Sequence, residues 1–247
     1  MRVLTYNIHR GIGGRDQRYE LERVVRVIQE EEPDLICLQE VDRNLKRSGR
    51  DDQPARLAEA CGAAGVLFQP NVTFRQGCYG NLLLSRWPFR DTSLISLRMA
   101  WHWPRGAQLA VVETPEGPLH LVNWHLGLGE HERHWQVRHL LGHADFGTSA
   151  DLPTLIIGDS NDWRNTLAHG PFAHHGFHHV TAPREHFRTF PAYYPIVSLD
   201  KAFARGPIRL VRARVVHSHL ARRASDHLPL VLDFRLADEN ETESRKF

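Results

Sequence analysis

Polar side chains recur where apolar stretches of this 247-residue chain end. Asn7 closes the first such stretch, Glu40 closes the second, and Asp159 follows the run TLIIG. A single Asp at such a position is most often a turn or helix cap, but a buried carboxylate is costly unless it meets a cation or a hydrogen-bond donor. The recurrence therefore favours one shared polar site. The other members of the set are Asn81, Asn123, His125, Asn161, Asp200, Asp226 and His227.

The residue types in this set indicate metal-assisted and acid–base chemistry. Asn, Glu and Asp supply the oxygen ligands that Mg²⁺ or Mn²⁺ prefers, and such cations take few protein ligands while keeping waters and substrate phosphate. A carboxylate beside a histidine fixes the tautomer of the ring and supports its cationic form. A metal ion and an imidazolium together neutralise the negative charge that grows on transferring phosphoryl oxygens.

Strands must bring these residues together, because ligands of open α/β folds gather in the crevice at strand ends. Runs such as LICL and TLIIG are apolar on consecutive residues, which is typical of strands covered on both faces. Apolar residues repeating at i, i+3, i+4 and i+7 predict helices over 19–32 and 130–146, and a shorter helix is expected over 54–61. Strands are predicted at 2–8, 34–41, 66–69, 80–85, 108–113, 119–126, 153–159, 199–204, 208–216 and 228–234.

Length and composition predict one α/β domain over residues 1–236, followed by a polar and disordered tail over 237–247. Lys and Arg number 31 against 29 Asp and Glu, so the formal net charge is +2. This balance gives no broad attraction to DNA or to an anionic membrane, although a local basic patch is compatible with it. Arg10, Arg15 and Arg18 form one such candidate cluster, close in sequence to Asn7.

The three cysteines, Cys37, Cys61 and Cys78, have no CxxC spacing and are interpreted as free thiols in a reducing compartment. No secretory signal and no apolar stretch long enough for a transmembrane segment is visible. We therefore expect a cytoplasmic protein, and the sequence suggests no obligate protein partner.

Seven short blocks resemble the successive signature motifs of the endonuclease/exonuclease/phosphatase superfamily, which has the DNase I-like fold. They are TYNIH, LQEV, YGNLLLS, NWHLG, GDSND, SLDKAF and SDHLPL, and they occur in the family's order between residues 5 and 230. No single block is decisive, whereas seven in order are a specific match. The stretches PRGAQLAVVE and RTFPAYYP further resemble a compact bacterial branch, some members of which are linked with phospholipid metabolism.

The resemblance implies a four-layer α/β/β/α sandwich in which two mixed β-sheets pack face to face. It also implies Mg²⁺ or Mn²⁺ as cofactor, with Glu40 as the principal metal ligand and with Asn7 and Asp226 in support. The family often has an aromatic residue where this chain has Ser160, and a small Thr or Ser where it has Trp124. Both departures lie beside the matched residues, so we expect them to affect pocket shape more than chemistry.

The same resemblance implies the catalytic roles. Asp159 would orient or deprotonate the attacking water, and Asn161 would hold that water or a phosphate oxygen. His227, oriented by Asp200, would stabilise the developing phosphoryl charge or assist proton transfer. His125 matches the family's second catalytic histidine or its phosphate-contacting equivalent.

Several residues have two interpretations. Asn81 either contacts substrate or is a hydrogen-bonded residue at a strand start. Arg105 either grips a phosphate, which a guanidinium can bind in a bidentate way, or is a solvated loop arginine. Trp101 and Trp103 either stack on a base or rest against acyl chains, with simple packing as the default.

The sequence thus predicts a divalent-metal-dependent hydrolase acting on phosphodiesters or phosphomonoesters. Its substrate would be a lipid headgroup, a small molecule or a nucleic acid, and the branch resemblance slightly favours a lipid or small-molecule phosphoester. The alternative within the class is a DNA or RNA nuclease. A non-catalytic binding scaffold on the same fold is the alternative of another class, but such proteins generally lose the acidic and histidine residues that this chain retains.

Overall fold

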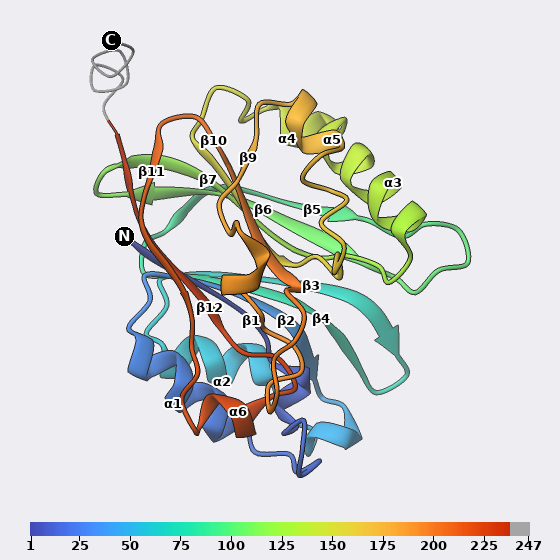
Figure 1. Ribbon diagram of the computed structural model, residues 1–247. Coiled ribbons are helices and arrows are strands. Elements are labelled where there is room, and N and C mark those ends of the chain that lie inside the picture. The colour runs from blue at the N-terminus through green and yellow to red at the C-terminus, as the bar shows by residue number, and fades with distance from the viewer. Residues whose placement is uncertain (238–247) are drawn as a thin grey trace.

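Apolar runs from both ends of the chain form the first β-sheet of the computed structural model, which describes residues 1–237. β1 and β2 are parallel, and the other neighbouring strands are antiparallel. The last strand therefore lies beside the first (Figure 1). The order across the sheet is β11 (Ile208–Val215), β12 (Leu230–Leu236), β1 (Arg2–Asn7), β2 (Leu35–Arg43), β4 (Gly77–Ser85) and β3 (Gly65–Phe74).

The middle of the chain forms a second six-stranded sheet. Only β7 and β8 are parallel in it, and the other neighbours are antiparallel. Both sheets are therefore mixed, as predicted. The order is β5 (Phe89–Ser96), β6 (Gly106–Thr114), β7 (Gly117–His125), β8 (Thr154–Asp159), β10 (Asp200–Arg205) and β9 (His178–His179).

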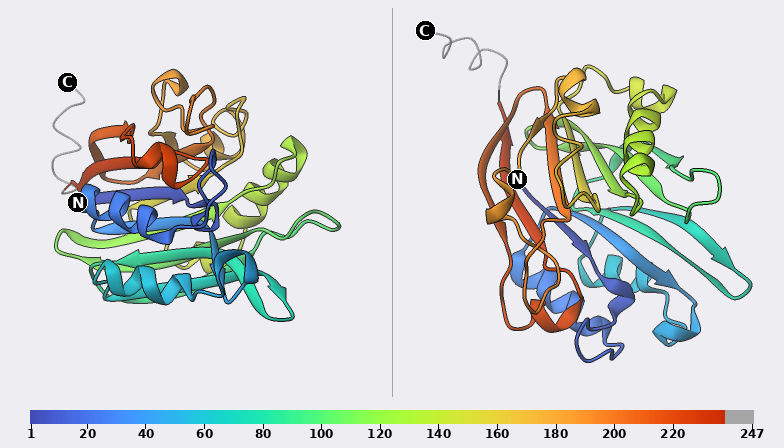
Figure 2. Two further views of the ribbon diagram at one scale, coloured as in Figure 1. Left: turned by 90° about the horizontal axis from the view of Figure 1, so that it is seen from below. Right: turned by 45° about the vertical axis from the view of Figure 1, so that its right-hand side comes forward.

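Helices cover the outer face of each sheet, which gives the four layers visible from top to bottom in Figure 1 and again in the right view of Figure 2. α1 (Leu21–Glu31), α2 (Gln53–Ala60) and α6 (Ala221–Ala224) lie on the first sheet. α3 (Glu130–Leu141), α4 (Ala144–Gly147) and α5 (Pro171–His174) lie on the second. Three short 3-10 turns, His9–Gly11, Lys46–Ser48 and Arg184–His186, occur in connecting loops. The predicted four-layer sandwich is confirmed.

Two apolar clusters explain why the strands are apolar on consecutive residues. One cluster joins side chains of both sheets and α1, among them Leu38, Leu121 and Val24. The other lies between the second sheet and its helices, where the buried ring of Trp124 packs near Phe172. Burial of both strand faces removes the polar alternation that a solvent-facing sheet would show.

The predicted strands are all present, with shifts at their ends, but β5 and β9 were not predicted. β5 is an edge strand with mostly exposed polar side chains, so it carries little apolar signal. The helix predicted over 130–146 was too long, because α3 ends at Leu141. Gly142 and His143 follow, and a separate short helix, α4, begins at Ala144.

No helix among residues 1–237 combines the length and the apolar character needed to cross a membrane. The tail predicted to be disordered lies outside the described residues, apart from Ala237. The amide of Ala237 donates to the carbonyl of Pro207 at 2.8 Å.

Candidate active site

A cavity of about 560 Å³ opens where the ends of strands from both sheets meet. Most of the residues predicted for the site border this cavity, although they come from widely separated parts of the chain. Its lining consists of Asn7, His9, Arg10, Glu40, Arg105, His125, Leu128, Asp159, Asn161, Trp163, Phe190, Val197, Leu199, Asp226 and His227.

Strand register places a row of polar residues across the second sheet. Gly106 of β6 pairs with His125 of β7, and His125 pairs with Asp159 of β8. Asp159 in turn pairs with Asp200 of β10. Because residues in register on neighbouring strands lie side by side, Arg105, His125, Asp159 and Asp200 come to one edge of the sheet.

The first sheet contributes Asn7 and Glu40 through a local irregularity in β2. Pairing of β2 with β4 shifts its register between Leu38 and Val41, and Glu40 has a left-handed φ of 59°. Such a bulge locally reorients the strand and can turn a side chain away from the regular alternation. Glu40 consequently borders the cavity beside Asn7, which ends the neighbouring strand β1.

Asp159 is held at the centre of the site by two donors. The backbone N–H of Asn161 donates to Asp159 Oδ1 at 3.0 Å, and Asn7 Nδ2 donates to Oδ2 at 3.0 Å. Asn161 itself is fixed by a bond from its Nδ2 to the carbonyl of Leu126 at 2.9 Å. The Asp159 carboxylate is 1% exposed, so both donors act in a largely dehydrated environment.

His227 forms a buried pair with Asp200. The ring Nδ1 lies 2.9 Å from Asp200 Oδ2, and Nε2 lies 3.7 Å from Asp159 Oδ2. Burial by itself lowers the pKa of His227, but the Asp200 and Asp159 carboxylates outweigh this effect and raise the pKa above its ordinary value. The imidazole is therefore held as a cation that points at Asp159.

His125 has the opposite character. Arg105 Nη1 lies 3.1 Å from His125 Nδ1, and a guanidinium can only donate, so Nδ1 must accept and the ring proton is on Nε2. That Nε2 lies 3.4 Å from Asp159 Oδ2. Burial and the adjacent Arg105 charge lower the pKa of His125 to about 4. A neutral donor and a cationic one thus face the same carboxylate oxygen.

A buried amide network joins the two sheets behind the site. Asn123 Oδ1 accepts from Gln39 Nε2 at 2.8 Å, and Asn123 Nδ2 donates to Gln108 Oε1 at 2.8 Å. The same Nδ2 also contacts the carbonyls of Leu38 and Leu82 at 3.1 and 3.2 Å. Gln39 immediately precedes Glu40, so the network fixes one half of the site relative to the other.

A profile of the Endonuclease/Exonuclease/phosphatase family matches residues 4–227. The chain belongs to this family. The uncharacterized protein YbhP of Escherichia coli strain K12 is 26% identical over 247 residues, covering 95% of this chain and 96% of YbhP. A crystal structure of an endonuclease/exonuclease/phosphatase from Beutenbergia cavernae is 26% identical with a TM-score of 0.80, covering 96% of this chain and 72% of that one. A mannosyl-6-phosphatase from Bacteroides thetaiotaomicron shares the fold at 17% identity and a TM-score of 0.72, covering 95% and 99% of the two chains.

Members of the endonuclease/exonuclease/phosphatase family are hydrolases that act on phosphoester bonds. The oxygen donors of Glu40, Asn7 and Asp226 border the cavity and have the chemistry that Mg²⁺ or Mn²⁺ prefers. No three His, Cys, Asp or Glu side chains converge on one ion position within residues 1–237. Mg²⁺ needs only one or two carboxylates, since waters and substrate complete its shell, and the donor set therefore fits this ion.

Arg10 is a cavity residue to which the sequence analysis gave no catalytic role. Its Nε and Nη2 both donate to Glu40 Oε2, at 3.0 and 2.8 Å. Burial raises the pKa of Glu40, but His125 and Arg10 lower it by more, so the pKa lies below its ordinary range. Arg15 and Arg18, which were grouped with Arg10, are exposed and do not border the cavity.

His9 and Phe190 also border the cavity and were not predicted. His9 Nε2 lies 4.0 Å from Asp226 Oδ2, and the Phe190 ring lies 5.0 Å from the His227 ring. The available signal was position alone, because His9 directly follows the first strand and Phe190 belongs to the RTFPAYYP stretch.

Asn81 does not border the cavity. Its buried Nδ2 donates to the carbonyl of Gly106 at 3.0 Å, so in this arrangement it connects the two sheets instead of facing a substrate. Arg105 is 9% exposed, which excludes the solvated interpretation of that residue. Ser160 and Trp124 are fully buried and lie outside the cavity lining. They belong to the protein interior, whereas we had expected them to shape the pocket.

Proposed function

We propose that this protein is a divalent-metal-dependent phosphoesterase that hydrolyses a phosphodiester or phosphomonoester by attack of water. The observation that supports this most is the convergence of Glu40, Asp159 and the His227–Asp200 pair on one cavity, although they come from both sheets. A metal-binding carboxylate, a base and a cationic imidazole are groups that together can promote phosphoester hydrolysis.

Asp159 acts as the residue that orients or deprotonates the attacking water. Its two fixed hydrogen bonds hold the carboxylate in one orientation, and Asn161 can hold the water or a phosphate oxygen next to it. His227 places a positive charge where the phosphoryl oxygens gain negative charge, and Asp200 keeps the imidazolium oriented. His125 contributes an Nε2–H donor to the same region.

Glu40 would hold Mg²⁺ or Mn²⁺, with Asn7 and Asp226 beside it. When bound, such an ion supplies Lewis-acid polarisation of the phosphoryl group. Arg10 is the cationic partner of Glu40 in the present arrangement and lies in the cavity next to the expected position of the phosphate.

The cavity size supports a small phosphoester or a lipid headgroup as substrate. A volume of about 560 Å³ is in the range of small-molecule sites. The structural likeness to a mannosyl-6-phosphatase is compatible with such a substrate, although it establishes only the fold. A DNA or RNA nuclease is the second candidate, since exposed aromatic side chains near the cavity could stack on bases.

A substrate panel tests the proposal. Purified protein is assayed with bis-(p-nitrophenyl) phosphate, phosphoinositides, sphingomyelin, abasic DNA and plasmid DNA, with Mg²⁺ or Mn²⁺ and with EDTA. We expect metal-dependent hydrolysis of at least one small or lipid phosphoester, and its loss in Asp159→Asn. Absence of hydrolysis across the panel with either metal would refute the proposal.

A further inference from the structure

Large apolar side chains are unusually exposed around the mouth of the cavity. They stand on four loops: between β5 and β6, between β7 and α3, after β8, and before β10. Six of them are at least half exposed: Trp101 (99%), Leu128 (75%), Tyr194 (71%), Ile196 (56%), Trp103 (55%) and Trp163 (50%). Apart from the adjacent Tyr193, only Val211 reaches this exposure elsewhere in residues 1–237. Scattered exposed hydrophobics need no explanation, but such concentration marks an interaction surface.

Cavity lining and chain connections place these loops beside the cavity. Leu128 and Trp163 belong to its lining, and Trp163 and Ile196 border a smaller adjoining cavity of about 190 Å³. The loop that carries Trp101 and Trp103 leads directly to Arg105, which lines the cavity, and projects from the right-hand side of the ribbon in Figure 1. His102 connects this loop to α3, because its Nδ1 lies 3.1 Å from Glu132 Oε2.

The loop before β10 reaches the cavity through its backbone. The N–H of Ala192, two residues before Tyr194, donates to the carbonyl of Asp226 at 2.7 Å. Asp226 belongs to the cavity lining, so Tyr194 and Ile196 stand beside the mouth as well.

Arginines lie among these apolar side chains. Arg164 Cζ stacks over the Trp163 ring at 4.7 Å, and Arg184 and Arg188 border the adjoining cavity. Arg222 Nη1 donates to the carbonyl of Tyr193 at 3.3 Å. Glu130 lies 3.8 Å from Arg164, and Glu185 lies 3.2 Å from Arg184, whereas no carboxylate of residues 1–237 forms a salt bridge with Arg188 or Arg222. The mouth is therefore apolar and presents two arginines that have no carboxylate partner in this part of the chain.

We propose that this mouth docks on the surface of an anionic phospholipid bilayer and admits a lipid phosphoester headgroup to the cavity. Trp and Tyr favour the boundary between headgroups and acyl chains, and arginines attract anionic lipids. Leu128 and Ile196 gain from contact with hydrocarbon, whereas they lack the π-face on which a nucleic-acid base would stack. A partner protein that covered these exposed side chains would block the mouth of the cavity. A bilayer that covered them would instead bring the lipid substrate to the mouth. This inference rests on the proposed phosphoesterase function for the choice of substrate.

Binding to vesicles tests the docking surface without any turnover. Wild-type protein is sedimented with vesicles of phosphatidylcholine alone and of phosphatidylcholine mixed with phosphatidylglycerol. We expect binding to the mixed vesicles, weaker binding to neutral ones, and a loss of about tenfold or more in affinity for the double variant Trp101→Ala/Trp103→Ala. Both tryptophans are largely solvent-exposed, and a thermal melt checks that the variant is folded.

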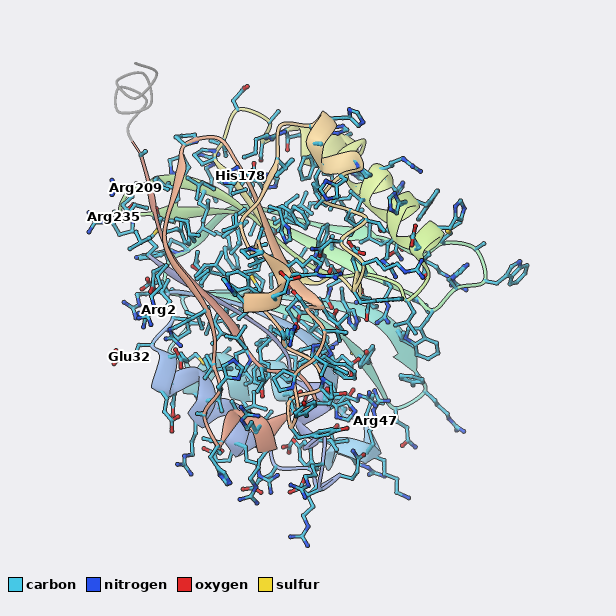
Figure 3. The ribbon with its side chains drawn as sticks, in the orientation of Figure 1. Arg2, Glu32, Arg47, His178, Arg209 and Arg235 are labelled. Carbon is cyan, nitrogen blue, oxygen red and sulfur yellow. The ribbon has the colours of Figure 1, made fainter. Side chains whose placement is uncertain are left out.

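Two control variants separate this inference from the proposed function. Val211→Ala removes a side chain about as exposed as that of Trp103 from β11, the strand of Arg209 at the left-hand edge of Figure 3, and should bind vesicles like wild type. Asp159→Asn should abolish hydrolysis but keep vesicle binding. Hydrolysis of a soluble phosphoester by a protein that binds no vesicles would overturn the docking surface alone.

Two further outcomes would also overturn it. If a single-stranded oligonucleotide binds, and only that binding is lost in the tryptophan double variant, the mouth recognises nucleic acid. If sedimentation velocity shows a dimer that the double variant abolishes, with no vesicle binding, the mouth contacts a second copy of the chain.

Discussion

Two histidines that look equivalent in the sequence differ in charge in the structure. His227 is paired with Asp200, which favours the imidazolium, whereas His125 accepts from Arg105 and stays neutral. Both face Asp159 Oδ2, at 3.7 and 3.4 Å. When the surroundings of two titratable groups shift their pKa values in opposite directions, the two groups typically have separate roles in the site.

Glu40→Gln should weaken Mg²⁺ binding by about tenfold or more, because it removes the negative charge that holds the ion while keeping the side-chain shape. The protein should stay folded, since Glu40 borders a cavity and is not part of the apolar core. Isothermal titration with Mg²⁺ measures the affinity, and a thermal melt checks folding. Activity that survives EDTA would show that no metal is needed.

Asp200→Asn and His227→Ala should each lower kcat about a hundredfold with little change in KM, because their charges act mainly in the transition state. Since Asp200 acts through His227, the double variant should be hardly worse than either single one. Steady-state kinetics on the best panel substrate provide the cycle. Asp233→Asn, which removes a partly buried pair with Arg2 outside the cavity lining, is the matched control. Additive losses in the cycle would contradict the pairing.

At the scale of elements, the site depends on how β2 and β7 are fixed to one another. The bulge at Glu40 turns its side chain to the cavity, and Asn123 makes four hydrogen bonds to groups on β2, β4 and β6. A buried hydrogen-bond network favours one relative position of the elements that it joins, and loss of one member leaves its partners as unpaired polar groups.

Asn123→Leu should therefore lower the free energy of unfolding by about 2–4 kcal/mol, because Gln108 and Gln39 lose buried partners. Urea denaturation measures the change. Gln29→Leu removes an exposed amide that makes a single bond to the carbonyl of Ala60, and should cost less than about 0.5 kcal/mol. Equal costs for the two variants would rule out a special role of the network.

His120 of β7 makes the second sheet sensitive to acid. Burial, with a smaller effect of Arg205, lowers the pKa of His120 to about 4, against 6.5 in the unfolded chain. The unfolded chain then binds more protons in this range, so stability present above pH 6.5 is lost as the pH falls towards 4. This histidine accounts for up to about 3 kcal/mol of that loss.

His120→Phe should reduce the loss, because a ring of similar size that cannot be protonated would pack in its place near Phe146. Urea denaturation of both proteins at about pH 7.5 and about pH 5 gives the comparison. An unchanged difference between the two pH values would mean that other groups, such as His179, dominate the acid response.

The whole molecule places an apolar, arginine-containing mouth on a chain with a net charge of only +2. A protein that neutralises several DNA phosphates loses affinity steeply with salt, whereas entry of a small headgroup into a cavity responds weakly. We therefore expect hydrolysis of a water-soluble, short-chain phosphoinositide, which needs no docking on a charged bilayer, to exceed plasmid cleavage and to fall only modestly across a salt titration. Efficient plasmid nicking that salt suppresses strongly, and that Asp159→Asn abolishes, would instead identify a nuclease.

The sequence by itself determined nearly all the strands and most of the polar residues of the cavity lining, and its resemblance to the family implied the layered fold. Strands buried on both faces need long apolar runs, so the polar residues that end them, such as Asn7, Glu40 and Asp159, stood out clearly. The edge strand β5 gave no such signal, since its exposed side chains are polar. Position in the sequence also could not separate Asn81, which joins the sheets, from the residues that face the cavity.

Only the tertiary structure decided the charge states and the surroundings of these residues. The tautomer of His125 depends on Arg105, twenty residues away, and the pairing of Arg10 with Glu40 depends on how the turn after β1 packs against the bulge in β2. The exposure of Trp101 and Trp103 contradicted the default of simple packing. Charge state, pairing and exposure depend on distances between segments that are remote in the chain. The local sequence pattern indicates only which side chains a strand or a helix must bury.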